Sequence, residues 1–148
     1  MDFANKILEN QTQAKFDFID LTEEIKKFVQ EKAGIKNGLV NIQTFHTTTS
    51  LILNENEPLL IEDIKQSLEN VAPESGEYNH DNFEIRTVNV CEGECANGHS
   101  HCKAARLPSN LTLNLIEGEL QLGTWQRILF VELDRSRKRK VQIRVMGE

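Results

Sequence analysis

The chain has 148 residues, of which 39% are hydrophobic and 27% are charged, and its formal net charge at pH 7 is −6. A chain of this length can bury one hydrophobic core without disulfides or structural metals, so we expect a single domain spanning residues 1–148. Acidic and basic residues are mixed along the sequence. This charge balance gives no reason to expect a nucleic-acid partner or a membrane surface.

Targeting and redox signals point to the cytoplasm. No apolar run approaches the roughly 20 residues that span a bilayer, and the first ten residues, with Asp2 and Glu9 among them, do not read as a signal peptide. The three cysteines all lie between Cys91 and Cys102. An odd number in one short stretch disfavours a disulfide framework, so a reducing cytoplasm is expected.

Alternating apolar residues predict two N-terminal strands, Ala4–Asn10 and Lys15–Ile19, joined by a polar turn. A helix then begins near Asp20, which has capping-box spacing with Glu23. Gly34 is its expected C-terminal stop. The apolar stripe of this helix comprises Leu21, Ile25, Phe28 and Val29.

The middle of the chain predicts two more strands and a second helix. Gly38–His46 reads as a strand, and Leu51–Leu53 continues as another. The second helix runs from Pro58 to about Val71, because proline suits a first helical turn. Asn56 or Glu57 is its expected cap.

Residues 72–103 are the least regular part of the sequence, and a long loop of this kind is often functional. The remainder is rich in predicted strands: Leu111–Leu115, Glu119–Leu122 after a two-residue turn at Glu117 and Gly118, Ile128–Leu133, and Val141–Val145. Ile128–Leu133 is apolar on both faces, as a central strand requires. The pattern predicts an α+β fold, a single compact domain with antiparallel or mixed, sandwich-like sheets covered by two helices.

The four histidines are the first candidates for chemistry: His46, His80, His99 and His101. His46 ends a predicted strand, and Asp63 lies at the edge of the helix that follows. Neutral imidazoles with one carboxylate are usual ligands of a catalytic zinc-type site. The same residues could act as general acids and bases, because imidazole titrates near neutral pH. Single histidines also commonly serve as hydrogen-bonded structural residues, so these alternatives remain open.

A second candidate is the cluster of Cys91, Cys95, His99, His101 and Cys102. Thiolates and imidazoles are suitable zinc ligands. However, the three-residue gap between the first two cysteines is looser than in a zinc knuckle, and no second cysteine pair follows. A polar loop with incidental cysteines is the favoured interpretation.

Two further polar runs have plain interpretations. The hydroxyl run Thr47–Ser50 could bind phosphate or order a metal-bound water, but a strand with a turn at its end is favoured. The basic run Arg135–Lys140 could meet phosphates of a ligand, but a solvated hairpin loop is favoured. Neither a Walker loop nor a GxGxxG or GxSxG motif is present, which removes the common nucleotide-binding and hydrolase interpretations.

A succession of short segments runs through the chain in a fixed order: His46–Leu51, Asn54–Asn56, Asp63, Pro73, Tyr78, His80–Asp81, His101, Ser109–Leu111, Gly123–Gln126, Glu132 and Gly147–Glu148. This succession resembles the YjbQ-like family of secondary thiamine-phosphate synthases. The resemblance covers roughly residues 40–148, whereas the N-terminal third matches only in its strand–strand–helix order.

The resemblance implies a compact α+β fold that assembles as a homotrimer, with a polar pocket near the subunit contacts. It implies an enzyme that joins hydroxymethylpyrimidine diphosphate to thiazole phosphate and expels pyrophosphate, an activity described for the family as secondary, that is, as a side activity. The alternatives are a non-catalytic module that binds a metal or a small phosphorylated ligand, and a metal-dependent hydrolase of unknown substrate. The expected cofactor is a divalent metal, either zinc or a similar transition metal, or magnesium with the diphosphate substrate.

Position by position, the resemblance assigns His46, His80 and His101 as metal ligands. It assigns catalytic roles to His46, His101 and Asp63. Asp63 would be a fourth ligand, a carboxylate that orients a histidine, or a general base. Ligand-binding positions are expected at Thr48, Trp125 and Gln126. Trp125 could stack on a heteroaromatic ring, although a core tryptophan is the commoner case.

Overall fold

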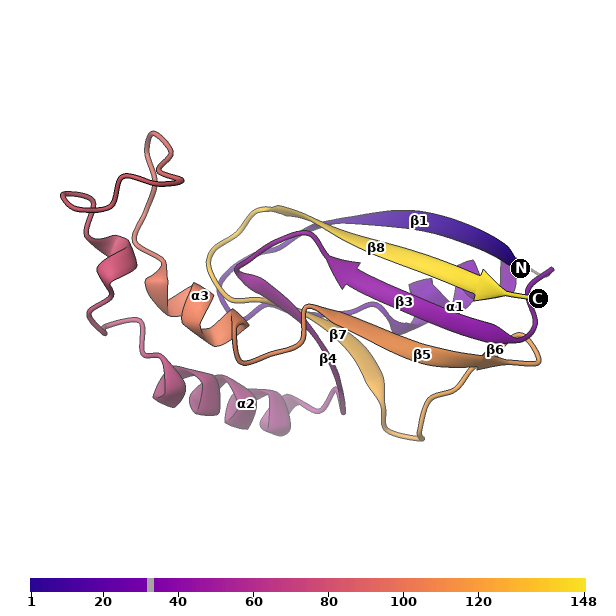
Figure 1. The fold of residues 1–148 in the computed structure, drawn as a ribbon. Coiled ribbons are helices and arrows are strands. Elements are labelled where there is room, and N and C mark those ends of the chain that lie inside the picture. Colours follow the sequence, from indigo (N-terminus) through magenta and orange to yellow (C-terminus); the bar gives the residue numbers. More distant parts are fainter. Residues whose placement is uncertain (32–33) are drawn as a thin grey trace.

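Two antiparallel sheets form the frame of the molecule (Figure 1). The computed structural model describes residues 1–31 and 34–148. The larger sheet has five strands in the order β1-β8-β3-β5-β6, with bounds Asp2–Gln11, Lys138–Gly147, Gly38–Thr44, Asn110–Ile116 and Glu119–Leu120. The smaller sheet has three strands in the order β2-β7-β4, with bounds Phe18–Asp20, Arg127–Glu132 and Thr49–Asn54.

Strand β7 is the central strand of the smaller sheet and is apolar on both faces, as the sequence predicts. Ile128 and Phe130 pack into the main core between the sheets. Val131 packs into a second apolar cluster with Leu68 on the opposite face. The alternation of side chains along a strand therefore places β7 between two layers of apolar contacts.

Helix α1 (Thr22–Glu31) and the residue before it contribute the predicted stripe to the main core: Ile25, Phe28 and Val29 from the helix, and Leu21. The helix begins two residues after Asp20, whose carboxylate accepts from the Thr22 amide. Glu23 pairs with Arg127 and so does not complete the expected capping box. The expected stop at Gly34 follows residues 32 and 33, which lie outside the described residues.

Helix α2 (Pro58–Val71) begins as predicted, with Glu57 as its N-cap. The Glu57 carboxylate accepts from the backbone amides of Leu59 at 2.9 Å and Leu60 at 2.7 Å. Buried Leu68 fixes the helix against the second cluster. Two otherwise unpaired helical amides are thus satisfied by a single side chain.

The segment between α2 and the larger sheet is more ordered than its sequence suggests. It holds the short helix η1 (Asn79–Asp81) and helix α3 (Gly98–Ala104), so the described residues contain a third α-helix where a loop is expected. In Figure 1 the stretch between η1 and α3 projects from the end of the molecule opposite the two termini. The helical repeat of α3 is too short to stand out among polar and small residues.

One further prediction about the strands is corrected by the structure, and another is confirmed. The second N-terminal strand is shorter than Lys15–Ile19, because Phe16 has a positive φ of 57° and the chain turns there. The hairpin turn at Glu117 and Gly118 is confirmed, with φ values of 53° and 80°. Positive φ at both central residues is the mark of a type I′ hairpin turn.

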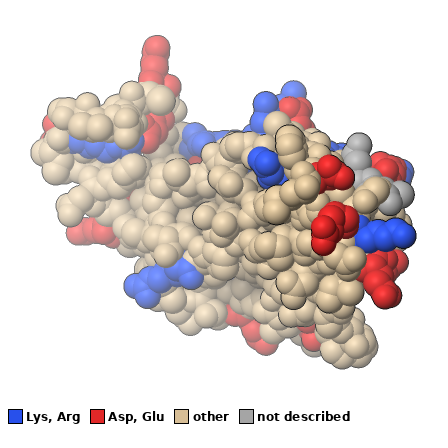
Figure 2. Space-filling model, turned by 45° about the vertical axis from the view of Figure 1, so that its right-hand side comes forward, with Lys and Arg blue, Asp and Glu red and all other residues tan. Residues whose placement is uncertain are grey.

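Basic and acidic side chains lie in small alternating groups on the face shown in Figure 2, which matches their mixing along the sequence. Within the described part of the chain, no helix is long and apolar enough to cross a membrane.

Candidate active site

A cavity of about 630 Å³ opens beside the end of the smaller sheet at which β4 begins and β7 ends. Its walls come from the hairpin between β7 and β8, from the turn before β4, and from the segment that carries η1 and α3. Three histidines and three hairpin arginines line it: His46, His80, His101, Arg135, Arg137 and Arg139. Thr47 and Thr48 add hydroxyl groups.

The basic run lies at the hairpin between β7 and β8, as predicted, but its arginines are not merely solvated. Arg135, Arg137 and Arg139 occupy every second position of the hairpin, and all three line the cavity. The intervening Lys138 is exposed and faces away from it. The two-residue period of an extended chain directs every second side chain to one face, and here that face is cationic.

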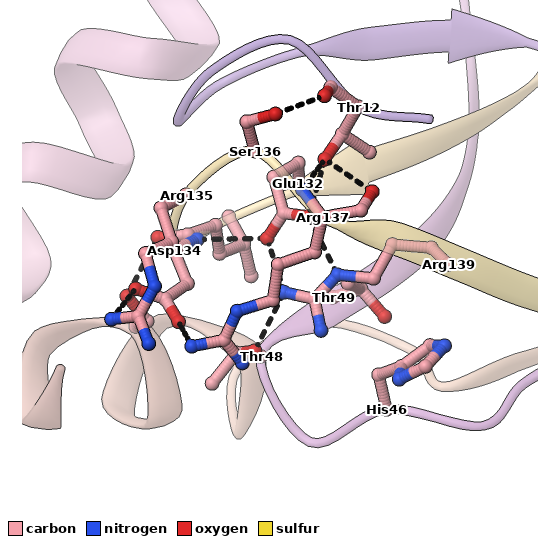
Figure 3. Close-up of polar contacts among 12 residues, drawn as sticks. Thr12, His46, Thr48, Thr49, Glu132, Asp134, Arg135, Ser136, Arg137 and Arg139 are labelled. Carbon is pink, nitrogen blue, oxygen red and sulfur yellow. Dashed lines mark hydrogen bonds and ion pairs between the residues drawn. The ribbon is translucent and has the colours of Figure 1, made fainter. Parts of the chain in front are cut away.

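Arg139 is buried, with an exposed fraction of 3%, and is held by Glu132. Its Nε donates to Glu132 Oε2 and its Nη2 to Oε1, each at 2.6 Å (Figure 3). Nη2 also donates to Thr48 Oγ1 at 3.1 Å, and Thr12 Oγ1 donates to Glu132 Oε2 at 2.9 Å. The pair therefore anchors Thr48 in the cavity floor, and the charge of Arg139 is already compensated.

Asp134 forms ion pairs with two arginines. Its carboxylate lies 3.0 Å from Arg137 Nη2 and 4.0 Å from Arg135 Nη1, and it accepts from Asn97 Nδ2 at 3.2 Å. One carboxylate cannot neutralise two guanidinium groups. The tip of the hairpin therefore presents positive charge to the cavity, where an anionic ligand would complete the balance.

His46 is fixed by the backbone of β8. The Lys140 amide donates to His46 Nε2 at 2.8 Å. Burial lowers the pKa of His46, and the positive charges of Arg139 and Arg137 lower it further against the opposing charge of Glu132. The imidazole is therefore biased towards its neutral form.

Helix α3 decides which histidine of the His99–His101 segment faces the cavity. Residues two apart on an α-helix point roughly 200° away from each other. His99 is buried on the inner side, where Lys103 Nζ donates to its Nδ1 at 3.3 Å. His101 lines the cavity, and its ring centroid lies 4.6 Å from that of His80.

The start of α3 is held by the residue that follows His80. Asp81 Oδ1 accepts from the amides of Asn97 and Gly98, each at 2.9 Å. This contact ties η1 to α3 and brings the His80 and His101 rings together. Burial lowers the pKa of His101, and nearby His80 and Arg86 lower it further against the opposing charges of Asp134 and Glu94.

The projecting loop is organised by Arg86. Its Nη1 donates to Glu94 Oε1 at 2.7 Å and to the His80 carbonyl at 3.2 Å, and its Nη2 donates to the Asn89 carbonyl at 2.7 Å. His80 Nε2 is buried without a hydrogen-bond partner and lies 4.0 Å from Glu94 Oε1. Arg86 therefore neutralises Glu94 and fixes the loop over His80.

The donor set suits a divalent metal only in part. His80 and His101 are adjacent, and His80 Nε2 has no partner, so these two imidazoles could share an ion. His46 differs, since its Nε2 already accepts a hydrogen bond. Across residues 1–31 and 34–148, no three His, Cys, Asp or Glu side chains are grouped to hold a metal ion. The three cysteines are free and exposed, and Cys91 alone among them lines the cavity.

Three of the expected site residues lie outside this cavity within one chain. Asp63 is exposed on α2. Trp125 is 71% exposed and lines a second hollow with Gln126, at the end of the smaller sheet where β4 ends at Asn54. Gln126 Oε1 accepts from the Gly123 amide at 2.8 Å and closes a tight turn. Since β4 has six residues, the two hollows are separated by about 16 Å of strand.

Comparison with known proteins identifies the chain. The family model described as UPF0047 protein YjbQ-like matches residues 6–148. The chain belongs to this family. A UPF0047 protein of Methanothermobacter thermautotrophicus is 33% identical over 148 residues, which cover 100% of this chain and 95% of the relative. The UPF0047 protein YugU of Bacillus subtilis is 32% identical over 143 residues, covering 96% of this chain and 98% of the relative.

Solved structures of this YjbQ-like type share the fold. A YbjQ-like protein of unknown function from Sulfolobus solfataricus P2 has a TM-score of 0.87 and 29% identity, and the match covers 99% of each chain. A YjbQ/UPF0047 protein from Clostridium acetobutylicum has a TM-score of 0.79 and 34% identity, covering 93% of this chain and 97% of that one. The predicted YjbQ-like α+β fold is thereby confirmed.

Sequence reasoning did not name Asn97 or Asp134, and it favoured a solvated loop over phosphate contacts for the basic run that contains Arg137 and Arg139. The arginines carried a usable signal, because Arg135, Arg137 and Arg139 alternate and must share one face of an extended hairpin. Asn97 and Asp134 gave no such signal. The hydrogen bond between them connects positions that lie 37 residues apart in the sequence.

Proposed function

We propose that this chain is an enzyme of the secondary thiamine-phosphate synthase type, which joins hydroxymethylpyrimidine diphosphate to thiazole phosphate and releases pyrophosphate. The supporting observation is the gathering of the hairpin arginines and the three histidines around one cavity of about 630 Å³. Departure of a diphosphate requires cationic stabilisation. Among the described residues, Arg135 and Arg137 share a single ion-pair partner, Asp134, so part of their charge is available to the leaving group.

A divalent metal would be held by His80 and His101, the adjacent imidazoles of the cavity. Bound there, it would supply further positive charge towards the phosphate oxygens. Elemental analysis of the purified protein tests this assignment. We expect about one zinc or similar ion per chain, lost in a His80→Ala, His101→Ala double variant. A metal content unchanged by the double substitution would place the ion elsewhere.

We also propose that the protein is a homotrimer and that its site is completed between copies. In support, Trp125 is 71% exposed, yet it belongs with Gln126 to a separate hollow far from the histidines of its own chain. A neighbouring copy could place the end of its smaller sheet that carries Trp125 next to this cavity, together with the exposed Asp63 of its helix α2. The three exposed, unpaired cysteines suit a reducing cytoplasm as the location of such an enzyme.

The assembly can be tested by size-exclusion chromatography with light scattering, where a monomer would contradict the trimer. Subunit mixing tests the shared site. Trp125→Ala and His101→Ala proteins, each inactive alone, should recover part of the wild-type turnover when they are mixed and refolded together. If each site is complete within one chain, every site in the mixture carries one of the two lesions and no activity returns.

The decisive experiment is product formation from hydroxymethylpyrimidine diphosphate and thiazole phosphate, followed as thiamine phosphate. Arg137→Ala should lower turnover about tenfold or more, because a charge-assisted contact is removed. Lys138→Ala is the matched control, since it removes the same charge from the same hairpin on the exposed face. Equal losses of turnover in both variants would show that Arg137 does not stabilise the leaving group.

Two other outcomes would redirect the assignment. Binding of the diphosphate without any turnover would identify a non-catalytic module for phosphorylated ligands, which the cationic lining also favours. Release of phosphate or pyrophosphate without the thiazole acceptor would identify a hydrolase.

A further inference from the structure

The position of His46 follows from the way in which the larger sheet ends. Strand β3 stops at Thr44, which is paired with Val141 of β8. Beyond this point the Phe45 amide still donates to the Lys140 carbonyl at 3.3 Å. The Lys140 amide would next require a carbonyl of β3, but it donates to Nε2 of the His46 ring at 2.8 Å instead. The imidazole thus completes the strand ladder in place of a backbone carbonyl.

This contact fixes the position of the ring proton. A backbone N–H is always a donor, so the nitrogen that receives it must present a lone pair. A neutral imidazole has one lone pair and one N–H. With the lone pair of Nε2 directed to Lys140, the proton resides on Nδ1 of His46. No other described residue hydrogen-bonds Nδ1, so this N–H is available to a ligand.

The surroundings of His46 favour the neutral donor. Burial disfavours a positive charge on the ring, and the nearby Arg139 and Arg137 disfavour it further by keeping the pKa of His46 low. Both arginines and His46 line the same cavity. An anionic ligand drawn to the guanidinium groups would therefore meet an N–H donor at the edge of the same surface.

We propose that His46 is locked by the Lys140 amide as the Nδ1–H tautomer and donates that N–H to a phosphoryl oxygen of the ligand, and that it does not coordinate a metal. The donor role rests on the proposed function, because it takes the ligand to be phosphorylated; the tautomer does not. A metal at Nε2 would leave the Lys140 amide unpaired, and a metal at Nδ1 would displace the ring proton. His80 and His101 remain the imidazoles suited to an ion.

The tautomer is tested on the ligand-free protein by long-range ¹H–¹⁵N correlation spectra of histidine-labelled samples. The His46 signals are assigned by their loss in His46→Gln. We expect Nε2 to resonate as an unprotonated imidazole nitrogen and Nδ1 as a protonated one, and the pattern to persist after Zn²⁺ is added. A proton on Nε2, or loss of the Nδ1–H signal on addition of Zn²⁺, would overturn the proposal.

The donor role is tested by calorimetric binding of inorganic pyrophosphate. In His46→Gln the amide oxygen can accept from Lys140 while the amide nitrogen donates, so affinity should stay within a few-fold of wild type. His46→Leu supplies neither group, and its affinity for pyrophosphate should fall roughly tenfold or more. Circular dichroism checks that both variants are folded. Wild-type affinity in folded His46→Leu would overturn the donor role.

Failure of the proposed function and failure of the inference about His46 would give different results. Absence of pyrophosphate binding by the wild-type protein would refute the proposed phosphorylated ligand and with it the donor role, while the tautomer would still be decided by the spectra. Normal pyrophosphate binding together with an Nε2–H tautomer would refute the inference about His46 and leave the proposed function intact.

Discussion

Glu132 and Arg139 face each other as a buried ion pair, with two parallel hydrogen bonds of 2.6 Å between guanidinium and carboxylate. They stand at the end of β7 and near the start of β8, seven residues apart along the hairpin. The pair fixes the hairpin whose other two arginines line the cavity. Its geometry links the stability of the fold to the arrangement of the site.

Loss of one partner of this pair should be severe. Arg139→Ala leaves the Glu132 carboxylate buried without its main counter-charge, and breaking a buried pair in this way costs about 3–5 kcal/mol. Chemical denaturation measures the change in unfolding free energy. Lys138→Ala, at an exposed neighbouring position, should change it by less than about 0.5 kcal/mol. A loss below about 1 kcal/mol for Arg139→Ala would show that water or another group replaces the arginine.

A methyl group at Gly98 should disturb the junction that brings His80 and His101 together. A Cβ there would lie 2.5 Å from Tyr78 Cβ and 2.8 Å from its Cγ. We expect Gly98→Ala to cost about 1–3 kcal/mol, as overpacking does. Gly34→Ala is the control, because a Cβ at Gly34 meets no atom of the described residues within 4 Å. Similar thermal midpoints for both variants would contradict the close approach to Tyr78.

Removal of Lys103 should depend on what replaces it. The side chain is fully buried, lies over the Phe16 ring, and pairs with Glu69 at 3.1 Å. Lys103→Ala leaves a cavity and should cost about 2–5 kcal/mol. Lys103→Met keeps most of the volume and should cost less than about 1.5 kcal/mol. If denaturation curves show methionine to be as damaging as alanine, the ammonium group and not the packing is what matters there.

The cap of α2 should make stability sensitive to acid. Hydrogen bonds from the amides of Leu59 and Leu60 hold the pKa of Glu57 below its ordinary value. A carboxyl group whose pKa is lower in the folded state stabilises the fold above the ordinary pKa of 4.5 and loses that effect as the pH falls through the folded-state pKa. Glu57→Gln should therefore lower the thermal midpoint at pH 7.

The difference between wild type and Glu57→Gln should shrink as the pH is lowered below 4.5, because the wild-type carboxylate then becomes protonated as well. Glu62→Gln, on the exposed side of the same helix, serves as the control. A gap between wild type and Glu57→Gln that is independent of pH would mean that charge at Glu57 does not contribute to the cap.

Local chemistry predicted much of the fold because its signals act over a few residues. The type I′ turn at Glu117 and Gly118, the cap at Glu57 and the two apolar faces of β7 all follow from spacing or residue type within one element. Helix α3 was missed because seven residues give the apolar period too little length. The family motifs named His46, His80 and His101, and the structure brings these three to one cavity.

By itself, then, the sequence determined the α+β class, most of the strands, and which histidines are candidates for the site. Only the tertiary structure decided that the basic hairpin lines a cavity, that His99 turns inward while His101 turns outward, and that Trp125 lies at the far end of the smaller sheet. The reason is the sequence separation of the deciding contacts. The hydrogen bond between His46 and Lys140 spans 94 residues of sequence, and the one between Thr48 and Arg139 spans 91. At such sequence separations local periodicity carries no information, and only the pairing of strands brings the groups together.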